Sequence, residues 1–168
     1  MGRIIVSLLT LAIFMTQGEA RSEQFIGEYG AWSAFTDGAG KEKSCYMFGR
    51  PEKREGKHKK RGKTYLLITH WPAKKDRNVV ELRAGYTYKK DSEVRVNIGS
   101  HGYSLFTRGA TAWAQDEKTD LSLALTMIKG ARLIARGVSS EGTRTRDTYS
   151  LKGFTAAYKA IGKACPVK

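Results

Sequence analysis

The stretch TYLLITHW, residues 64–71, is nearly all apolar and β-branched, a pattern typical of a central strand buried on both faces. Pro72 follows and ends the strand, because proline has no amide hydrogen for the ladder. A further strand is expected over residues 78–88. Residues 93–98 (EVRVNI) alternate between polar and apolar, so their valines and isoleucine should face the core. The centre of the chain is therefore expected to be a β-sheet.

Shorter patterns extend this sheet in both directions. We expect strands at residues 30–35, 44–48, 103–106, 110–114, 133–138 and 143–151, joined by glycine-rich turns. Two segments have helical spacing instead: residues 116–129, with Gly130 as C-cap, and the amphipathic C-terminal segment from Phe154 to Cys165. About eight or nine short strands with frequent turns fit an antiparallel sandwich or barrel better than a parallel α/β fold. The predicted class is mainly β, with one internal helix and a short C-terminal helix.

The first twenty residues resemble a secretory signal peptide. Arg3 gives a positive start, residues 4–15 are almost continuously apolar, and Gly18 and Ala20 are small residues at the cleavage positions. The alternative is a membrane anchor, but the apolar run is shorter than the roughly 20 residues that span a bilayer. We therefore expect a signal peptide over 1–20, a weakly structured lead-in over 21–29 and one domain over 30–168. The product would be exported to the periplasm, with possible destinations at the outer membrane or outside the cell, and would have no membrane span.

Cys45 and Cys165 are the two cysteines of the chain. In an oxidising compartment such a pair usually forms a disulfide, which would fix the C-terminal segment to an early strand. The alternative is two free buried thiols. Two cysteines and three scattered histidines do not form a structural zinc site, and we expect no metal or other cofactor.

The segment RPEKREGKHKKRGK, residues 50–63, has the highest density of positive charge. It contains eight lysines and arginines and two glutamates, in a sequence with a formal net charge of +14. Nothing apolar in it can pack, so it is expected to be a long exposed loop. Its summed field would attract phosphates, sulfates and carboxylates. The candidate anion-binding residues are Arg50, Lys53, Arg54, Lys57, Lys59, Lys60, Arg61 and Lys63.

Extracytoplasmic anions and nucleic acid are the two classes of partner that this charge could attract, and a role in solubility is the alternative. Outside the cytoplasm the available anions are lipopolysaccharide, acidic lipids and acidic glycans. Nucleic acid would suit the charge but not the compartment, so it is not expected. The alternative is that the loop is solvated and serves solubility only.

Catalytic motifs are not recognisable. The sequence contains no G-x-S-x-G nucleophile elbow. Ser139, His70 and Asp147 could in principle meet as a triad, but such residues occur in any exported domain, and His70 is better explained as a buried histidine. The tryptophans at 32, 71 and 113 lie in or beside strand patterns, which favours core packing over an exposed carbohydrate platform. We expect a protein that is not an enzyme.

Four stretches together resemble the invasion-associated locus B family of small exported proteins of Gram-negative bacteria: WSAFTDGAGKEKSCYMFGRP, TYLLITHWPAKKDRNVVELRAGY, AWAQDEKTD and GVSSEGTRTRDTYSLKGFTAAYKAIGKAC. The resemblance covers residues 31–165. It implies an immunoglobulin-like β-sandwich with added helix and a location in the envelope, and it supplies no catalytic or binding residues. The family pattern has a cysteine near Thr36 that is missing here, which leaves Cys165 as the candidate partner of Cys45.

These observations lead to one principal hypothesis and two alternatives. The principal hypothesis is a non-catalytic exported protein that binds an anionic or protein partner at the cell envelope or host surface through its basic loop. The partner would be lipopolysaccharide, an acidic glycan or an envelope protein. The alternatives are an exported hydrolase with an unrecognised site, and an interaction module that uses a sheet edge or an aromatic face.

Overall fold

The strand β5 (Tyr65–Trp71) is an interior strand of the sheet, between β3 and β6, as the sequence predicts. The computed structural model describes residues 23–57 and 61–167. The other strands of the described chain are β1 (Gln24–Tyr29), β2 (Trp32–Asp37), β3 (Ser44–Gly49), β4 (Lys53–Glu55), β6 (Asp76–Arg83), β7 (Glu93–Ile98), β8 (His101–Arg108), β9 (Thr111–Trp113), β10 (Arg132–Val138) and β11 (Arg144–Ser150). The α-helices are α1 (Glu117–Lys129) and α2 (Phe154–Ala164), and short 3-10 turns lie at η1 (Gly40–Glu42) and η2 (Pro72–Lys74).

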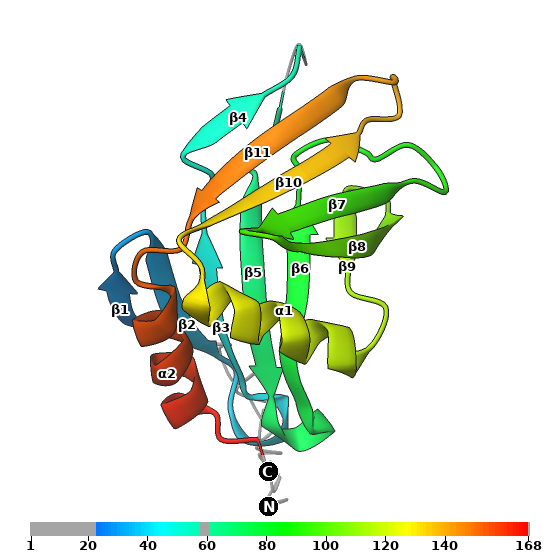
Figure 1. Cartoon of the computed structure of the whole chain (residues 1–168). Helices are drawn as coiled ribbons and strands as arrows, with labels where there is room; N and C mark the ends of the chain where they lie inside the picture. The colour runs from blue at the N-terminus through cyan, green and yellow to red at the C-terminus, as the bar shows by residue number, and fades with distance from the viewer. Residues whose placement is uncertain (1–22, 58–60, 168) are drawn as a thin grey trace, which may run out of the picture.

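All of these strands pair antiparallel in one continuous sheet. Within the described residues the sheet has eleven strands in the order β1-β2-β3-β5-β6-β9-β8-β7-β10-β11-β4. The sheet folds over, so that β10, β11 and β4 cross the ends of β5 and β6 at an angle, and both helices lie on the same side of β5 and β6 (Figure 1). This confirms the predicted mainly β sandwich with one internal and one C-terminal helix.

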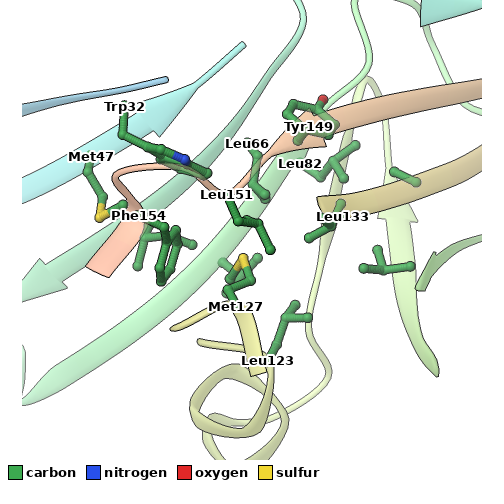
Figure 2. Close-up of a cluster of buried hydrophobic side chains, with 14 of the residues drawn as sticks. Trp32, Met47, Leu66, Leu82, Leu123, Met127, Leu133, Tyr149, Leu151 and Phe154 are labelled. Atoms are coloured by element: carbon green, nitrogen blue, oxygen red, sulfur yellow. The ribbon is translucent and has the colours of Figure 1, made fainter. Parts of the chain in front are cut away.

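The core lies between the two parts of the folded sheet and beneath the helices. Alternate residues of β2, β3, β5 and β6 point into it, and β10, β11 and both helices close it from the other side (Figure 2). Trp32 packs edge-on against Phe154 of α2, with ring centroids 4.9 Å apart. Its indole N–H donates to the Ser150 carbonyl at 3.0 Å, so this buried ring has both an apolar contact and a partner for its polar atom.

A disulfide fixes the C-terminal end of α2 to this core. Cys165 bonds to Cys45 of β3 across a sequence separation of 120 residues, and both residues are buried. The predicted pairing is therefore confirmed. At the other end of α2, Gly153 has φ 90°, and a Cβ there would lie 1.8 Å from the Tyr29 carbonyl oxygen, so only glycine allows β1 to run this close to the helix start.

The structure differs from the sequence prediction in three strands. The lead-in expected to be weakly structured contains β1, which pairs with β2 and packs Ile26 and Tyr29 against the core. The central strand is not buried on both faces, because Tyr65 and Leu67 remain half-exposed. The strand expected over residues 78–88 ends at Arg83, since Gly85 then turns the chain with φ 76°.

The basic segment is not the single exposed loop that its composition predicts. Its β4 part pairs with β11, which places Arg54 opposite Asp147. Beyond β4, Arg61 turns inward and forms a two-bond ion pair with Asp147, Nη1 to Oδ1 at 2.7 Å and Nη2 to Oδ2 at 2.5 Å. Only 8% of the Arg61 side chain and 3% of the Asp147 side chain are exposed.

Further contacts hold Arg61 in place. Its Nε and Nη2 donate to the Ala84 carbonyl at 3.1 and 2.9 Å, and its guanidinium lies 5.2 Å from the centre of the Tyr86 ring. The neighbouring Gly62 N–H donates to the Gly85 carbonyl at 2.8 Å. Arg61 therefore joins β11 to the chain beyond β6 and, contrary to the prediction, is not exposed to a ligand.

Replacing Arg61 by Met should lower the free energy of unfolding by about 3–5 kcal/mol, because Asp147 would remain as an uncompensated buried charge. The double variant Arg61→Met/Asp147→Leu should recover most of that loss, since no charge is then buried. Urea unfolding measures both. The matched control is Arg144→Met, which replaces an exposed arginine of β11, the strand that carries Asp147. It should change the free energy of unfolding by less than about 0.5 kcal/mol. Equal effects of Arg61→Met and Arg144→Met would contradict the structural role of the pair.

Candidate functional site

The outer face of β3 and β5 carries a cluster of aromatic side chains. Since side chains alternate between faces along a strand, Tyr46 and Phe48 point away from the core that Cys45 and Met47 enter, and Tyr65 and Trp71 do the same on β5. All four are half-buried. These four residues form what we call the aromatic floor.

The rings of this floor are held by their neighbours. Phe35 of β2 stacks on both Tyr46 and Phe48, with centroid distances of 5.3 and 5.8 Å. Phe48 meets Tyr65 at 6.2 Å. The Tyr46 hydroxyl donates to a carboxylate oxygen of Glu23 at 2.5 Å, and partial burial together with this carboxylate raises the pKa of Tyr46. The floor is thus a preformed surface of packed aromatic rings.

A groove of about 770 Å³ lies over the aromatic floor, and three residues of the basic segment border it. Arg50, Arg54 and Lys63 line the groove, and none of them forms an ion pair with a described residue. We call these three residues the cationic rim. Their charges are available to an anion in the groove.

Two acidic side chains, Asp37 and Glu81, also line the groove. Glu81 is engaged by Arg83, whose Nη2 lies 2.8 Å from Oε1. The same guanidinium lies 5.3 Å from the centre of the Tyr65 ring. Lys74 lies 5.4 Å from the centre of the Trp71 ring. The surroundings of the floor are therefore predominantly positive.

The eight candidate residues from the sequence have different positions. Arg50, Arg54 and Lys63 come together at the rim, while Arg61 is buried in its ion pair. Lys53 is exposed and pairs with Glu55 at 3.0 Å, and Lys57 is exposed near the end of the described segment. Lys59 and Lys60 lie outside the described residues.

The sequence analysis missed the aromatic floor. Of the three tryptophans, Trp32 is in the core as expected, but Trp71 and Trp113 are half-exposed. Trp71 lies in the groove. The signal was available in the alternation of SCYMFG, where Tyr46 and Phe48 occupy the positions opposite to the buried Cys45 and Met47.

The three residues considered as a catalytic triad do not form one. The Ser139 hydroxyl accepts from the Thr143 N–H at 3.1 Å, His70 Nδ1 accepts from the Asn78 N–H at 3.1 Å, and Asp147 is bound to Arg61. All three side chains are buried. The described residues also contain no group of three or more His, Cys, Asp or Glu side chains that could hold a metal ion.

The fold and the groove define a class: a disulfide-linked, mainly β, sandwich-like protein whose described residues include two α-helices and a surface groove. The groove combines aromatic rings with cations that form no ion pair with a described residue. Residues 32–162 match the family described as Invasion associated locus B (IalB) protein. The chain belongs to this family.

One solved structure supports the fold independently. The crystal structure of invasion associated protein b from Bartonella henselae matches with a TM-score of 0.57 and 17% sequence identity, covering 82% of this chain and 96% of that one. No curated protein matches the sequence. Among the described residues, no helix is both long and apolar enough to span a membrane.

Two buried titratable groups have pKa values shifted in the direction of the neutral form. Burial lowers the pKa of His70 to about 4. Burial also raises the pKa of Asp120 to about 6, although its Oδ1 accepts the Val80 N–H at 2.8 Å. As the pH falls from about 6.5 to about 4, His70 takes up its proton more readily in the unfolded chain, which costs stability. Over nearly the same range Asp120 takes up its proton more readily in the folded chain, which adds stability.

Asp120→Asn should therefore make the protein lose more stability on acidification than the unmodified protein does. The amide oxygen can keep the bond from Val80 N–H, but the proton uptake that offsets His70 is gone. The difference in free energy of unfolding between the variant and the unmodified protein should change by about 2 kcal/mol between pH 7 and pH 4. Urea unfolding at each pH measures it. Glu141→Gln, in an exposed turn, is the control. Parallel stability curves for Asp120→Asn and the unmodified protein would show that Asp120 is not shifted.

Proposed function

We propose that this protein is a non-catalytic exported envelope protein that binds an anionic saccharide in the groove between the aromatic floor and the cationic rim. The observation that carries the proposal is the placement of Arg50, Arg54 and Lys63, without ion-pair partners among the described residues, beside four half-buried aromatic rings. The ligand would be lipopolysaccharide or an acidic glycan, which share sugar rings and negative charges.

The aromatic floor supplies the part of the site that would recognise a sugar ring. The flat faces of Tyr and Trp rings pack against the C–H faces of a sugar, and the hydroxyl of Tyr65 or the indole N–H of Trp71 can bond to its hydroxyl groups. A volume of about 770 Å³ lies in the usual range of ligand pockets, roughly 300–1,000 Å³. A purely electrostatic surface would need no such floor.

The cationic rim supplies the part that would recognise the charge. The planar guanidinium groups of Arg50 and Arg54 can each donate two parallel hydrogen bonds to a carboxylate, phosphate or sulfate, whereas the ammonium of Lys63 acts as a point charge. Since all three are near the surface, their attraction should be screened over about 8–10 Å at physiological ionic strength. Affinity should therefore fall as salt is added.

Export is supported by the signal-like segment over residues 1–20 and by the Cys45–Cys165 disulfide, because disulfides persist mainly in oxidising compartments. In the Gram-negative envelope, lipopolysaccharide is the abundant anionic saccharide. An acidic glycan of a host surface has the same combination of ring and charge.

The test measures binding of the purified exported protein to immobilised lipopolysaccharide, heparin and neutral dextran over a salt series. Binding should be selective for the two anionic ligands and weaken with salt. The triple variant Arg50→Ser/Arg54→Ser/Lys63→Ser should bind at least tenfold more weakly. The control, Lys89→Ser/Lys90→Ser/Arg108→Ser, removes three exposed positive charges elsewhere and should leave affinity nearly unchanged. Equal losses in the two triple variants, or no binding by the unmodified protein, would overturn the proposal.

A second comparison separates saccharide recognition from simple anion attraction. Trp71→Ala should weaken binding to heparin or lipopolysaccharide but not to inorganic polyphosphate, which has charge and no sugar ring. The preference between lipopolysaccharide and heparin identifies the bacterial or host source of the ligand. If Trp71→Ala weakened binding to polyphosphate by the same factor, the aromatic floor would not be responsible for recognising the sugar ring.

A further inference from the structure

A second groove lies on a different part of the surface, between α1, the β7–β8 turn and the start of β10. It has a volume of about 940 Å³. Figure 1 shows that α1 runs below β7 and β8. It shares no lining residue with the groove over the aromatic floor. Leu121, Leu125 and Ile134 contribute apolar surface to it, and the buried Ile98 lies behind them. We call it the α1 groove.

One stripe of α1 faces this groove. Lys118, Leu121, Leu125 and Lys129 are spaced by three, four and four residues, which places them on one side of a helix. The opposite side of α1 is already used, because Leu123, Ala124 and Met127 are buried in the core. Leu121 and Leu125 remain 43% and 48% exposed, so the helix has a second apolar patch that nothing in the described chain covers.

The walls of the groove are fixed by specific contacts. The Tyr103 hydroxyl of β8 lies 2.6 Å from the Thr126 hydroxyl and donates to the Ser122 carbonyl at 3.2 Å. At the helix end, a Cβ on Gly130 would lie 2.5 Å from Ile98 Cγ2, so glycine is needed for β7 to pack this closely. The groove therefore exists before any partner binds, which reduces the ordering cost of binding.

The charged side chains that line the α1 groove are all positive. Among the described residues that line it, none is acidic. Lys118 and Lys129 form no ion pair with a described residue, whereas Arg132 is engaged by Glu52 at 3.1 Å. With a rise of 1.5 Å per residue, the two lysines lie about 16 Å apart along the helix, with the two leucines between them.

This arrangement discriminates among possible occupants. A second copy of α1 would place its own lysines against these lysines, in either direction, and like charges would repel. A single fatty acyl chain has one charged end and would leave one lysine without a partner. A helix with acidic side chains at both ends of an apolar stripe matches the whole length, since helix-in-groove binding uses apolar residues spaced by three or four.

We propose that the α1 groove binds an amphipathic α-helix of a protein partner, with apolar side chains at its centre and acidic side chains about three turns apart. Leu121 and Leu125 contact the apolar centre of that helix. Lys118 and Lys129 pair with its two acidic ends. The α1 groove is separate from the groove over the aromatic floor, and binding of the helix does not depend on binding of a saccharide.

The test uses three synthetic helical peptides of sixteen residues, followed by fluorescence anisotropy. The first has glutamates at both ends of a leucine stripe, the second has lysines in place of the glutamates, and the third has serines in place of the leucines. The first should bind, and the other two should bind at least tenfold more weakly. No binding by any peptide, or equal binding by all, would overturn the proposal.

Variants of the protein locate the binding. Leu121→Ser/Leu125→Ser should weaken binding of the first peptide at least tenfold, whereas Phe25→Ser/Phe106→Ser should not, although Phe25 and Phe106 are 61% and 41% exposed elsewhere on the surface. Thermal melting confirms that each variant is folded.

Phosphatidylglycerol vesicles form a separate arm of the experiment. Vesicle binding that requires Leu121 and Leu125, without peptide binding, would assign the groove to lipid and overturn the helix proposal. The variant Arg50→Ser/Arg54→Ser/Lys63→Ser should bind the peptide normally, so failure of either proposal is visible independently of the other.

Discussion

The buried ion pair between Arg61 and Asp147 determines how the two parts of the sheet meet. It joins β11 to the chain that follows β6, and all three donor nitrogens of the Arg61 guanidinium are used by Asp147 or by the Ala84 carbonyl. Burying two charges is costly unless every donor and acceptor is satisfied. Few alternative arrangements of this chain could bury both charges with these partners, so the pair fixes the position of Arg61 and of the residues that follow it into β5.

The position of the candidate saccharide site follows from that path. With Arg61 turned inward, Lys63 lies just before β5 and lines the groove, and Arg54, held by the pairing of β4 with β11, lines it as well. The inner face of β3 and β5 is covered by helices and by the rest of the sheet, while the outer face remains open. The same alternation of side chains thus produces the core on one face and the aromatic floor on the other.

Several elements could be predicted from local patterns alone. The alternation of EVRVNI gives β7 with the predicted bounds. The capping residues of α1, Asp116 and Gly130, define its ends, because Asp116 accepts the Thr119 N–H and Gly130 allows close packing on Ile98. β1 was missed because Phe25, Ile26 and Tyr29 do not alternate regularly with polar residues. Its pairing with β2 and its contact with α2 stabilise the strand instead.

Local patterns along the chain are enough to predict the mainly β class, the two helices, the pairing of the two cysteines and the concentration of positive charge at residues 50–63. The strands and helices follow from the periodicity of apolar residues, and the charge follows from composition. The disulfide follows from the presence of two cysteines, each of which has only the other as a partner. Which of those charges are available to a ligand depends on contacts made in the folded protein. Arg61 is buried because it pairs with Asp147 of β11, which lies 86 residues away in the sequence. Arg50, Arg54 and Lys63 line a groove whose aromatic rings come from two different strands. Contacts between residues so distant in sequence have no local signature, and so neither groove could be read from the order of the residues.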